Sequence, residues 1–335
     1  MKKYIIQANV KGFDALQVRE MNPVKPGTGE VSVRVHAAAI NYRDLITVKR
    51  GVGRELIPFS DGAGVVEETG AGVTGLKKGD KVLGLFFPLW QGGSMDAHRF
   101  SVARGGVSLD GMLAQYVCGH ESGFMKIPQY MSYEEASTLP CAGLTAWNAL
   151  MVQGRLRPGQ TVVIQGTGGV ALFSLQFAKI MGARAIVLSS TADKLRRAKK
   201  MGADILINYR ENPSWDKIIM EKTDGKGADL IVELGGGGTL ERSMNAAKIR
   251  GRISLIGVLT GVSDRVNPMP ILRKCLSING IYVGSGDMQK QMHAALETNQ
   301  IHPVIDRIFP FDKAGDAFAY MESAQHFGKI VIRID

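Results

Sequence analysis

A glycine-rich segment is the first feature of the sequence that points to chemistry. Residues Gln165-Gly166-Thr167-Gly168-Gly169-Val170-Ala171 match the pattern G-x-G-x-x-A at Gly166, Gly168 and Ala171. In this pattern the first glycine makes a tight turn, the second lets a pyrophosphate approach the backbone, and the small third residue lets a helix pack closely. The other interpretation is a plain glycine-rich turn, and the elements around the segment decide between the two.

Those elements are the ones that a dinucleotide-binding fold requires. An apolar strand at 161–165 precedes the glycines, an apolar helix at 170–181 follows them and ends at Gly182, and a second strand follows at 185–188. The alternation continues through helix 192–201, strand 205–208, helix 214–222, strand 230–234, helix 239–247 and strand 252–256. This rhythm predicts an α/β fold with a doubly wound parallel sheet, covered by helices on both faces.

The end of the second strand indicates which dinucleotide is bound. Enzymes that use NAD place an acidic residue there to accept hydrogen bonds from the adenosine ribose, whereas this chain has Ser189-Ser190-Thr191. Small hydroxyl residues leave room for a 2′-phosphate, which Lys194 and Arg210 would neutralise. Lys194 alternatively covers a helix face. We expect NADPH as the cofactor.

The remaining sequence predicts a second, mostly β domain. Residues 1–135 contain short apolar segments separated by glycine and proline, which are typical of a barrel-like antiparallel unit. The last fifty residues are expected to return to this unit. The predicted domains are therefore 1–135 together with 285–335, and a nucleotide-binding domain at 136–284. The long polar connection at 88–111 is either a cleft loop or a surface excursion.

Composition narrows the class of protein. No apolar stretch approaches the ~20 residues of a membrane helix, and the N-terminus lacks a signal-peptide core. Three widely separated cysteines favour a reducing compartment, so we expect a cytoplasmic protein. The net charge of +10 is scattered and has no interleaved aromatic residues, which argues against a dedicated nucleic-acid partner.

Several further segments, in this order, resemble the medium-chain dehydrogenase/reductase superfamily, and within it the zinc-independent branch similar to quinone oxidoreductases. The resemblance spans essentially the whole chain. Besides the glycine loop, it is carried by Asn41-Tyr42-Arg43-Asp44, Ser60-Asp61-Gly62-Ala63-Gly64, Lys78-Gly79-Asp80-Lys81-Val82, Leu139-Pro140-Cys141-Ala142-Gly143-Leu144-Thr145 and Ile207-Asn208-Tyr209-Arg210.

The resemblance implies a GroES-like substrate domain with an inserted Rossmann domain, a cleft between them, and a homodimer formed through the Rossmann sheet edge near Ser277–Val283. It also implies residues near each part of the cofactor. These are Thr145 at the nicotinamide; Gly166, Gly168, Gly169 and Val170 at the pyrophosphate; Ser189, Ser190, Lys194 and Tyr209 at the 2′-phosphate; Gly235, Ile256, Gly257 and Val258 at the ribose and nicotinamide; and Lys329 near the phosphates.

Zinc relatives in this superfamily supply three metal ligands from separate segments, and this chain lacks most of them. Asn41 stands at the position of the first cysteine and Ser60 at that of the histidine, so only Cys141 matches. Asp61 replaces the neighbouring glutamate. One thiol and one carboxylate do not make a catalytic zinc site, and a structural zinc lobe needs four cysteines. We expect no metal.

Without a metal, other groups must stabilise charge on the acceptor oxygen. Asn41 and Tyr42 are the candidate catalytic residues, since an amide and a phenol can donate to that oxygen. The structural alternative is that Asn41 caps the following helix and Tyr42 fills a domain interface. Ser60 and Trp90 complete the expected substrate pocket, with Trp90 as a lid. Arg43 and Asp44 are expected to form an ion pair or turn contacts.

These features predict an enzyme that transfers hydride from NADPH to a small conjugated carbonyl acceptor, such as a quinone or an enone. Two alternatives remain open. One is an alcohol dehydrogenase acting on alcohols or aldehydes, with zinc or with zinc replaced. The other is a non-catalytic NADPH-binding protein, including an RNA-associated one, which the positive net charge keeps open.

Overall fold

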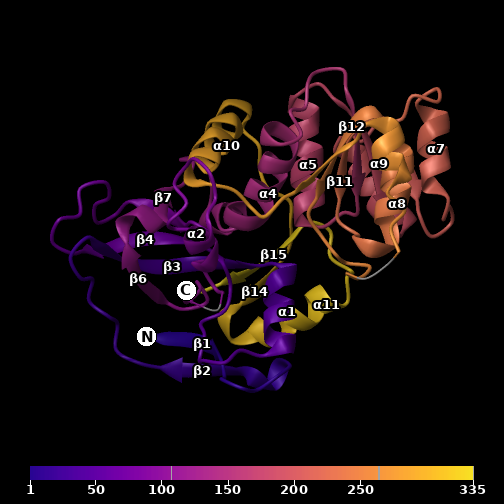
Figure 1. Ribbon diagram of the computed structural model, residues 1–335. Coiled ribbons are helices and arrows are strands. Elements are labelled where there is room, and N and C mark those ends of the chain that lie inside the picture. The colour runs from indigo at the N-terminus through magenta and orange to yellow at the C-terminus, as the bar shows by residue number, and fades with distance from the viewer. Residues whose placement is uncertain (107, 263–264, 335) are drawn as a thin grey trace. The chain divides into compact units, whose positions relative to one another are not determined.

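The computed structural model describes residues 1–106, 108–262 and 265–334. The chain folds as two compact units, one formed by residues 1–144 with 284–335 and the other by residues 145–283. The second unit is thus inserted in the sequence of the first, as Figure 1 shows by colour. No helix among the described residues is long and apolar enough to span a bilayer.

The inserted unit is built on a six-stranded parallel sheet with the order β10-β9-β8-β11-β12-β13. Its strands are β8 (Thr161–Gln165), β9 (Arg184–Ser189), β10 (Ile205–Asn208), β11 (Ala228–Glu233), β12 (Ala247–Leu255) and β13 (Ser277–Gly280). The central strands are valine- and isoleucine-rich and buried, because helices cover both faces. In Figure 1 helix α5 (Gly169–Ile180) lies on one side of the strands, and α8 (Gly237–Ala246) and α9 (Met269–Lys274) lie on the other. The predicted doubly wound sheet is confirmed.

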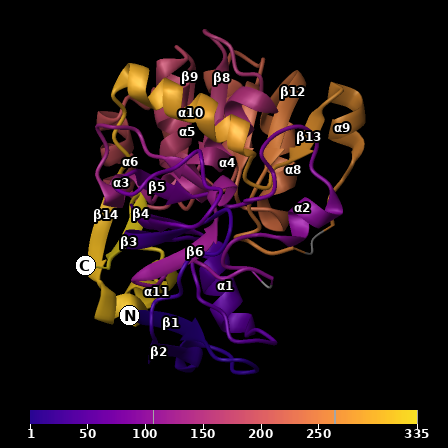
Figure 2. The same ribbon diagram turned by 90° about the vertical axis from the view of Figure 1, so that its left-hand side faces the viewer.

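The other unit contains a seven-stranded sheet and a separate two-stranded sheet of β1 (Lys2–Ile6) and β2 (Leu16–Glu20). The larger sheet runs β14-β15-β3-β4-β5-β7, with β6 also paired to β3. Its strands are β3 (Glu30–Ile40), β4 (Asp61–Thr69), β5 (Lys81–Gly84), β6 (Tyr116–His120), β7 (Phe124–Lys126), β14 (Ile305–Pro310) and β15 (Lys329–Arg333). All pairs are antiparallel except β14 with β15. The predicted mostly β domain is confirmed, and Figure 2 shows its strands and α1 from the side.

Strand register brings distant segments of this unit together. Ile330 of β15 is opposite Ile40 of β3, and Ala39 of β3 is opposite Asp61 of β4. The end of β3 therefore lies between the start of β15 and the start of β4. Helix α1 (Tyr42–Arg50) begins directly after β3. Its first residues therefore lie close to the starts of β15 and β4.

Several elements of this unit were not predicted from the sequence. These are β2, α2 (Ala97–Ser101) within the 88–111 connection, and α11 (Ala314–Glu322); the helical stretch from Leu139 to Val152, which continues from this unit into the inserted one, was not predicted either. The stretch 139–152 is partly π-helical, which weakens a regular 3.6-residue period. Helix α11 buries only four of its residues, including Phe318, against the β core, so its apolar stripe is short.

Candidate functional site

The glycine loop lies where the sequence placed it, between β8 and α5. Gly166 has φ of +79°, a left-handed conformation that favours glycine. Gly168 is the N-cap of α5, with φ of −80° and ψ of −173°. The backbone N–H groups of Gly169 and Val170 open the twelve-residue helix α5, whose N-terminus attracts anions because its first N–H groups lack helical partners.

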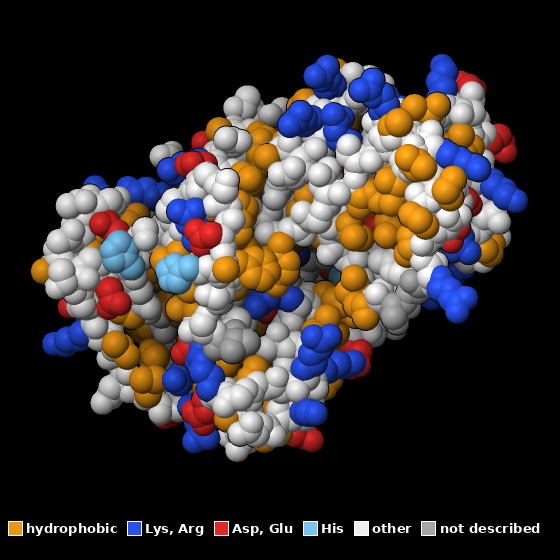
Figure 3. Space-filling view, in the orientation of Figure 1, with side chains coloured by type: hydrophobic (Ala, Val, Ile, Leu, Met, Phe, Trp, Pro, Cys, Tyr) orange, Lys and Arg blue, Asp and Glu red, His pale blue; other side chains and the backbone are white. Residues whose placement is uncertain are grey.

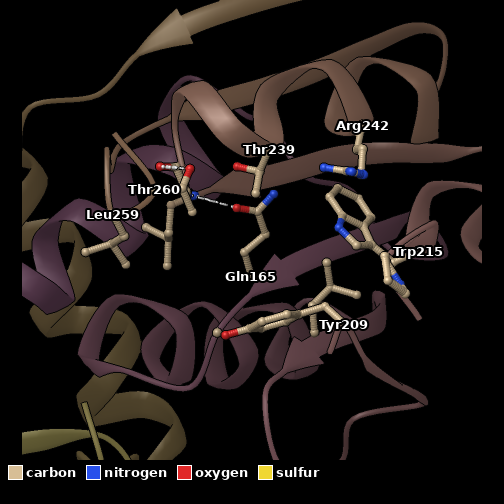
Figure 4. A pocket seen from close by; sticks show the side chains of 12 residues that line it. Gln165, Tyr209, Trp215, Thr239, Arg242, Leu259 and Thr260 are labelled. Carbon is tan, nitrogen blue, oxygen red and sulfur yellow. Dashed lines mark hydrogen bonds between the residues drawn. The ribbon is translucent and has the colours of Figure 1, made fainter. Parts of the chain in front are cut away.

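A pocket of about 300 Å³ lies beside this loop in the inserted unit. Its lining includes three predicted cofactor residues, Gly166, Tyr209 and Gly235. Figure 4 shows Gln165, Tyr209 and Trp215 directed toward the same space. The other lining residues are Leu188, Pro213, Leu234, Thr239, Arg242, Leu259 and Thr260. The residues of this second group carry no signal in the sequence, because only tertiary packing brings them to one wall.

A buried carboxylate shapes the loop after β11. Glu233 is fully buried and accepts hydrogen bonds from the backbone N–H groups of Gly235 and Gly236, at 2.8 and 3.0 Å. Its second oxygen accepts from Gln165 Nε2 at 2.6 Å, and Gln165 Oε1 in turn accepts from Gly235 N at 3.0 Å. Thr239 Oγ1 also donates to Glu233, at 2.5 Å. The network fixes the backbone of 233–236 next to the glycine loop. An acid between an apolar strand and four glycines is a sequence signal that could have found this loop.

The predicted 2′-phosphate residues come together at the ends of β9 and β10. Ser189 is only 2% exposed, and its Oγ lies 3.4 Å from Thr167 Oγ1 of the glycine loop. Ser190 is half-buried, and Tyr209, whose N–H donates to the Ser189 carbonyl at 3.1 Å, is 41% exposed. Lys194 lies on the first turn of α6 (Ala192–Lys200). Ser190, rather than Ser189, therefore offers the accessible hydroxyl.

The segment 256–258 also reaches the loop after β11. The N–H groups of Ile256 and Gly257 donate to the Glu233 carbonyl, at 2.9 and 3.2 Å. A Cβ on Gly257 would lie 2.3 Å from the Leu234 carbonyl oxygen, so this close approach requires glycine. Val258 is 43% exposed, whereas Thr145 is buried at the start of the unit.

The first unit contains a second group of predicted residues, which we call the polar cluster: Asn41, Asp44, Ser60, Asp61, Cys141 and Lys329. All are buried except Cys141, which is half-buried. The strand register of β15, β3 and β4 explains why five of them meet. Cys141 comes from the helical stretch that begins at Leu139.

Hydrogen bonds connect the members of the polar cluster. Lys329 Nζ donates to Asn41 Oδ1 at 2.6 Å and to the Ile40 carbonyl at 2.8 Å. Ser60 Oγ donates to Asp61 Oδ1 at 2.7 Å, and Cys141 N donates to Asp61 Oδ2 at 3.2 Å. Asn41 Nδ2 makes a longer contact of 3.4 Å with Ser60 Oγ. The ammonium of Lys329, expected near the cofactor phosphates, is thus engaged by two acceptors within its own unit.

Asp44 connects the cluster to helix α1. Its Oδ2 accepts from the backbone N–H of Asn41 at 2.8 Å, as in a capping box, and its Oδ1 lies 3.2 Å from Arg43 NH1. The expected Arg43–Asp44 ion pair is confirmed. The Arg43 guanidinium also donates to the carbonyls of Arg104 and Gly105. Arg43 therefore holds the 104–105 backbone against the start of α1.

Burial perturbs the ionisable groups of the cluster. It raises the pKa of Asp44 to about 6, against the opposing effect of Arg43. It also raises the pKa of Asp61, which the positive charge of Lys329 and the hydrogen bond from Ser60 oppose. Burial lowers the pKa of Lys329, and Asp61 is the main group that counteracts this. Asp61 and Lys329 therefore stabilise each other's charged forms.

Tyr42 and Trp90 differ in their surroundings. Tyr42 is 45% exposed, so its phenol is accessible beside the buried Asn41. Trp90 is 8% exposed, contacts the Phe87 ring edge-on at 6.1 Å between centroids, and donates from Nε1 to the Gly93 carbonyl. Trp90 is thus packed and hydrogen-bonded in this conformation, and its role as a lid stays a prediction. Ser60 is likewise fully buried, and its hydroxyl is directed at Asp61 instead of an open pocket wall.

Two family profiles match the chain. Residues 27–129 match the alcohol dehydrogenase GroES-like domain, and residues 169–298 match the zinc-binding dehydrogenase domain. A zinc-type alcohol dehydrogenase-like protein of Schizosaccharomyces pombe is 39% identical over 99% of both chains. The chain belongs to the medium-chain dehydrogenase/reductase superfamily. It is an oxidoreductase of that superfamily, whose Rossmann domain binds a nicotinamide cofactor.

Two further superfamily members illustrate the range of similarity. A 2-methylene-furan-3-one reductase of Solanum lycopersicum is 32% identical, over 90% of this chain and 71% of its own. The crystal structure of a putative alcohol dehydrogenase from Sinorhizobium meliloti is 38% identical, with a TM-score of 0.91 over all of both chains. Members named as dehydrogenases and as a reductase therefore share this fold.

The zinc in the name of the matching domain does not fit the polar cluster of this superfamily member. The cluster offers one thiol and two carboxylates. Both oxygens of Asp61 already accept hydrogen bonds, and the oxygens of Asp44 accept from Asn41 N and pair with Arg43. Burial raises the pKa of the Cys141 thiol, which disfavours the thiolate that zinc requires. A lysine ammonium also lies in the cluster. Across the described stretches of chain, no three His, Cys, Asp or Glu side chains are grouped to hold a metal ion.

Proposed function

We propose that this protein is an NADPH-dependent reductase of conjugated carbonyl compounds, quinones or enones, that works without catalytic zinc. The observation that carries the proposal is the composition of the polar cluster, in which an asparagine, a serine and a lysine ammonium accompany a single thiol and two carboxylates. Reduction of a conjugated acceptor needs no Lewis acid, because charge delocalises onto its oxygen. The name of the Solanum lycopersicum relative, a methylene-furanone reductase, is consistent with such an acceptor.

The proposed cofactor is NADPH. The supporting features are the serines at the end of β9, Lys194 on the first turn of α6 and the exposed Tyr209, with no carboxylate at the end of β9 to bind a ribose 2′-hydroxyl. The glycine loop would hold the pyrophosphate and the backbone of 233–236 would pass beside the ribose. NADPH supplies the hydride from C4 of its nicotinamide.

In the proposed reaction the hydride adds to the electrophilic carbon of the acceptor, and the displaced electron pair moves to the conjugated oxygen. A proton completes the product, so NADPH, acceptor and one proton give NADP⁺ and the reduced acceptor. Asn41 and Tyr42 would bind the oxygen as it gains charge, with Tyr42 or water as the proton source. Tyr42 is suited to this task because its phenol is exposed beside Asn41.

An alcohol dehydrogenase that oxidises alcohols is the second candidate, and the names of the Schizosaccharomyces pombe and Sinorhizobium meliloti relatives favour it. The two candidates differ in metal and in substrate. Stoichiometric zinc in the purified protein, with turnover of simple alcohols, would support the dehydrogenase.

The cofactor proposal is tested by fluorescence titration with NADPH and NADH. We expect tight binding of NADPH, about tenfold weaker binding by Lys194→Ala, and no effect of that variant on NADH, because Lys194 would contact only the 2′-phosphate. Arg196→Ala, a neighbouring cation paired with Asp193 on the same helix, is the matched control. Preference for NADH in the wild type would contradict the proposal.

We also propose that the protein is a cytoplasmic homodimer whose inserted units meet at strand β13. This strand is at the edge of the parallel sheet. Exposed apolar side chains lie in the segment that precedes it and directly after it. They include Val262, Val266, Met269, Leu272 and Tyr282. Figure 3 shows hydrophobic side chains gathered over α8 and α9. An unpaired edge strand with an apolar surround is a favourable place for a second copy.

A further inference from the structure

The proposed function assigns no part of the reaction to the buried ammonium of Lys329. Lys329 is 3% exposed at the start of β15. Among the lysines and arginines in the described part of the chain, only Lys329 and Arg104 are buried. Arg104 donates to the carbonyls of Leu85 and Gly123 and thus joins two loops. Lys329 also donates to a carbonyl, that of Ile40, but its second acceptor is a side chain, that of Asn41.

The position of Lys329 follows from the sheet. The pairing of Ile330 with Ile40 places Lys329 at the end of β3, and the pairing of Ala39 with Asp61 places the carboxylate of Asp61 at the same end. Asp61 is the main charge that favours the ammonium form of Lys329. The ammonium therefore lies among the segments where zinc relatives hold their metal.

Stability does not account for the burial of these two opposite charges. Two opposite charges taken out of water gain about as much from their attraction as they lose in hydration, and apolar residues of similar size are often at least as stable. The cluster is nonetheless balanced, since Lys329 and Arg43 offset Asp61 and Asp44. The positive and negative charges of these four residues are thus equal in number, and the Lys329 ammonium is bonded to the Asn41 amide. Such a cluster is suited to stabilise a negative charge that forms on a bound acceptor during the reaction.

We propose that Lys329 is a positioning residue of the acceptor site, whose ammonium fixes and polarises the Asn41 amide and supplies the fixed positive charge for the acceptor oxygen. This inference rests on the proposed function, because it takes Asn41 as a donor to that oxygen. A donor bonded to Asn41 Oδ1 draws electron density from the amide and strengthens Nδ2–H as a donor. The contact of Nδ2 with Ser60 Oγ is long, at 3.4 Å, so a stronger acceptor can replace it.

A charge-balanced double variant separates a functional charge from a structural one. Lys329→Met removes the ammonium and leaves Asp61 buried without it, whereas Lys329→Met combined with Asp61→Asn removes both charges. We would measure melting temperature and, with NADPH and 2-cyclohexen-1-one or 1,4-benzoquinone, kcat and KM. We expect Lys329→Met to lower the melting temperature and the double variant to regain most of it.

In both variants we expect kcat to fall roughly 30- to 100-fold with little change in KM for the acceptor, since the lost interaction acts on charge formed in the transition state. NADPH affinity should not change, because the Lys329 ammonium donates to Ile40 O and Asn41 Oδ1 and not to the phosphates near which the resemblance placed it. A double variant whose kcat returns to within about threefold of wild type would show that Lys329 only balances Asp61, and would overturn the inference.

A second measurement on the wild-type protein needs neither turnover nor a folded variant. 4-Nitrophenol is added to the protein with NADP⁺ at fixed pH, and the phenolate absorbance band is recorded. A fixed positive charge at the acceptor site should increase the phenolate fraction, and the increase should saturate with protein. An unchanged or smaller phenolate band would contradict the inference. Absence of turnover with every quinone and enone, together with an increased phenolate band, would refute the proposed function and leave the positive site standing.

Discussion

Single side chains in the polar cluster have different acidities from the same residues in water. Asp44 is 1% exposed, and its pKa of about 6 results mainly from burial, which Arg43 opposes only in part. The folded protein therefore binds a proton at Asp44 more tightly than the unfolded chain does. By linkage, this group's contribution to stability is full below the unfolded pKa near 4 and decreases as pH rises toward 6.

The Asp44→Asn variant tests this at the scale of one residue. Asparagine does not titrate but still has an oxygen that can accept from Asn41 N. The pH-dependent contribution of residue 44 to the free energy of unfolding should therefore disappear. We expect the free energy of unfolding of the variant, minus that of wild type, to increase by about 2 kcal/mol between pH 4 and pH 6. Urea denaturation at several pH values measures it. Asp193→Asn, at an exposed ion pair, is the control and should run parallel to wild type.

At the scale of one element, the glycine loop shows that two glycines of one motif are needed for different reasons. Gly166 has φ of +79°, and a Cβ added to it would meet no other atom within 4 Å, so its requirement is conformational. Gly168 has φ of −80°, which any residue adopts. Glycine at position 168 would instead be needed because a side chain there would occupy the space of a bound pyrophosphate.

Alanine at each position should therefore give opposite results. We expect Gly166→Ala to lower the free energy of unfolding by about 1 kcal/mol, because alanine is strained at positive φ. We expect Gly168→Ala to retain wild-type stability and to weaken NADPH binding at least tenfold, because its methyl group would meet the phosphates. Thermal unfolding and fluorescence titration measure the two effects. Equal NADPH affinity of Gly168→Ala and wild type would argue against a pyrophosphate at this loop.

At the scale of the whole molecule, the inserted unit has an exposed apolar surface near one of its two sheet edges. Strand β10 forms one end of the sheet and β13 the other. Leu272 on α9, near β13 in the sequence, is 73% exposed. Burial of such side chains would favour association of two copies at roughly 25 cal/mol for each Å² removed from water.

Leu272→Glu should shift the protein from dimer to monomer at micromolar concentration, because the new carboxylate would be desolvated in the interface. The side chain is exposed in the single chain, so the variant should fold normally. Sedimentation velocity measures the state. Val24→Glu, at an exposed valine of the other unit, is the control and should remain dimeric. A monomeric wild type would show that β13 is not an interface.

The sequence by itself predicted much of the inserted unit, because its signals are local. Strands 161–165 and 185–188 and the glycines between them lie within thirty residues, and α5 begins within one residue of the expected helix. The 2′-phosphate candidates also follow from position at strand ends. The sequence did not predict that Trp215 and Arg242 line the pocket. Sheet order rather than sequence spacing brings them to the same pocket as Gln165.

The substrate unit shows the limit of sequence reasoning. The resemblance to zinc relatives indicated which positions to compare, and the residue types at those positions then gave an incomplete zinc ligand set. The contacts of Lys329 were decided by tertiary structure, because Asn41, which accepts its hydrogen bond, is 288 residues away. Only the antiparallel pairing of β15 with β3 and of β3 with β4 brings the ammonium, the amide and Asp61 to one place. Backbone hydrogen bonds between distant strands fix that register, and no local pattern encodes which strands become neighbours.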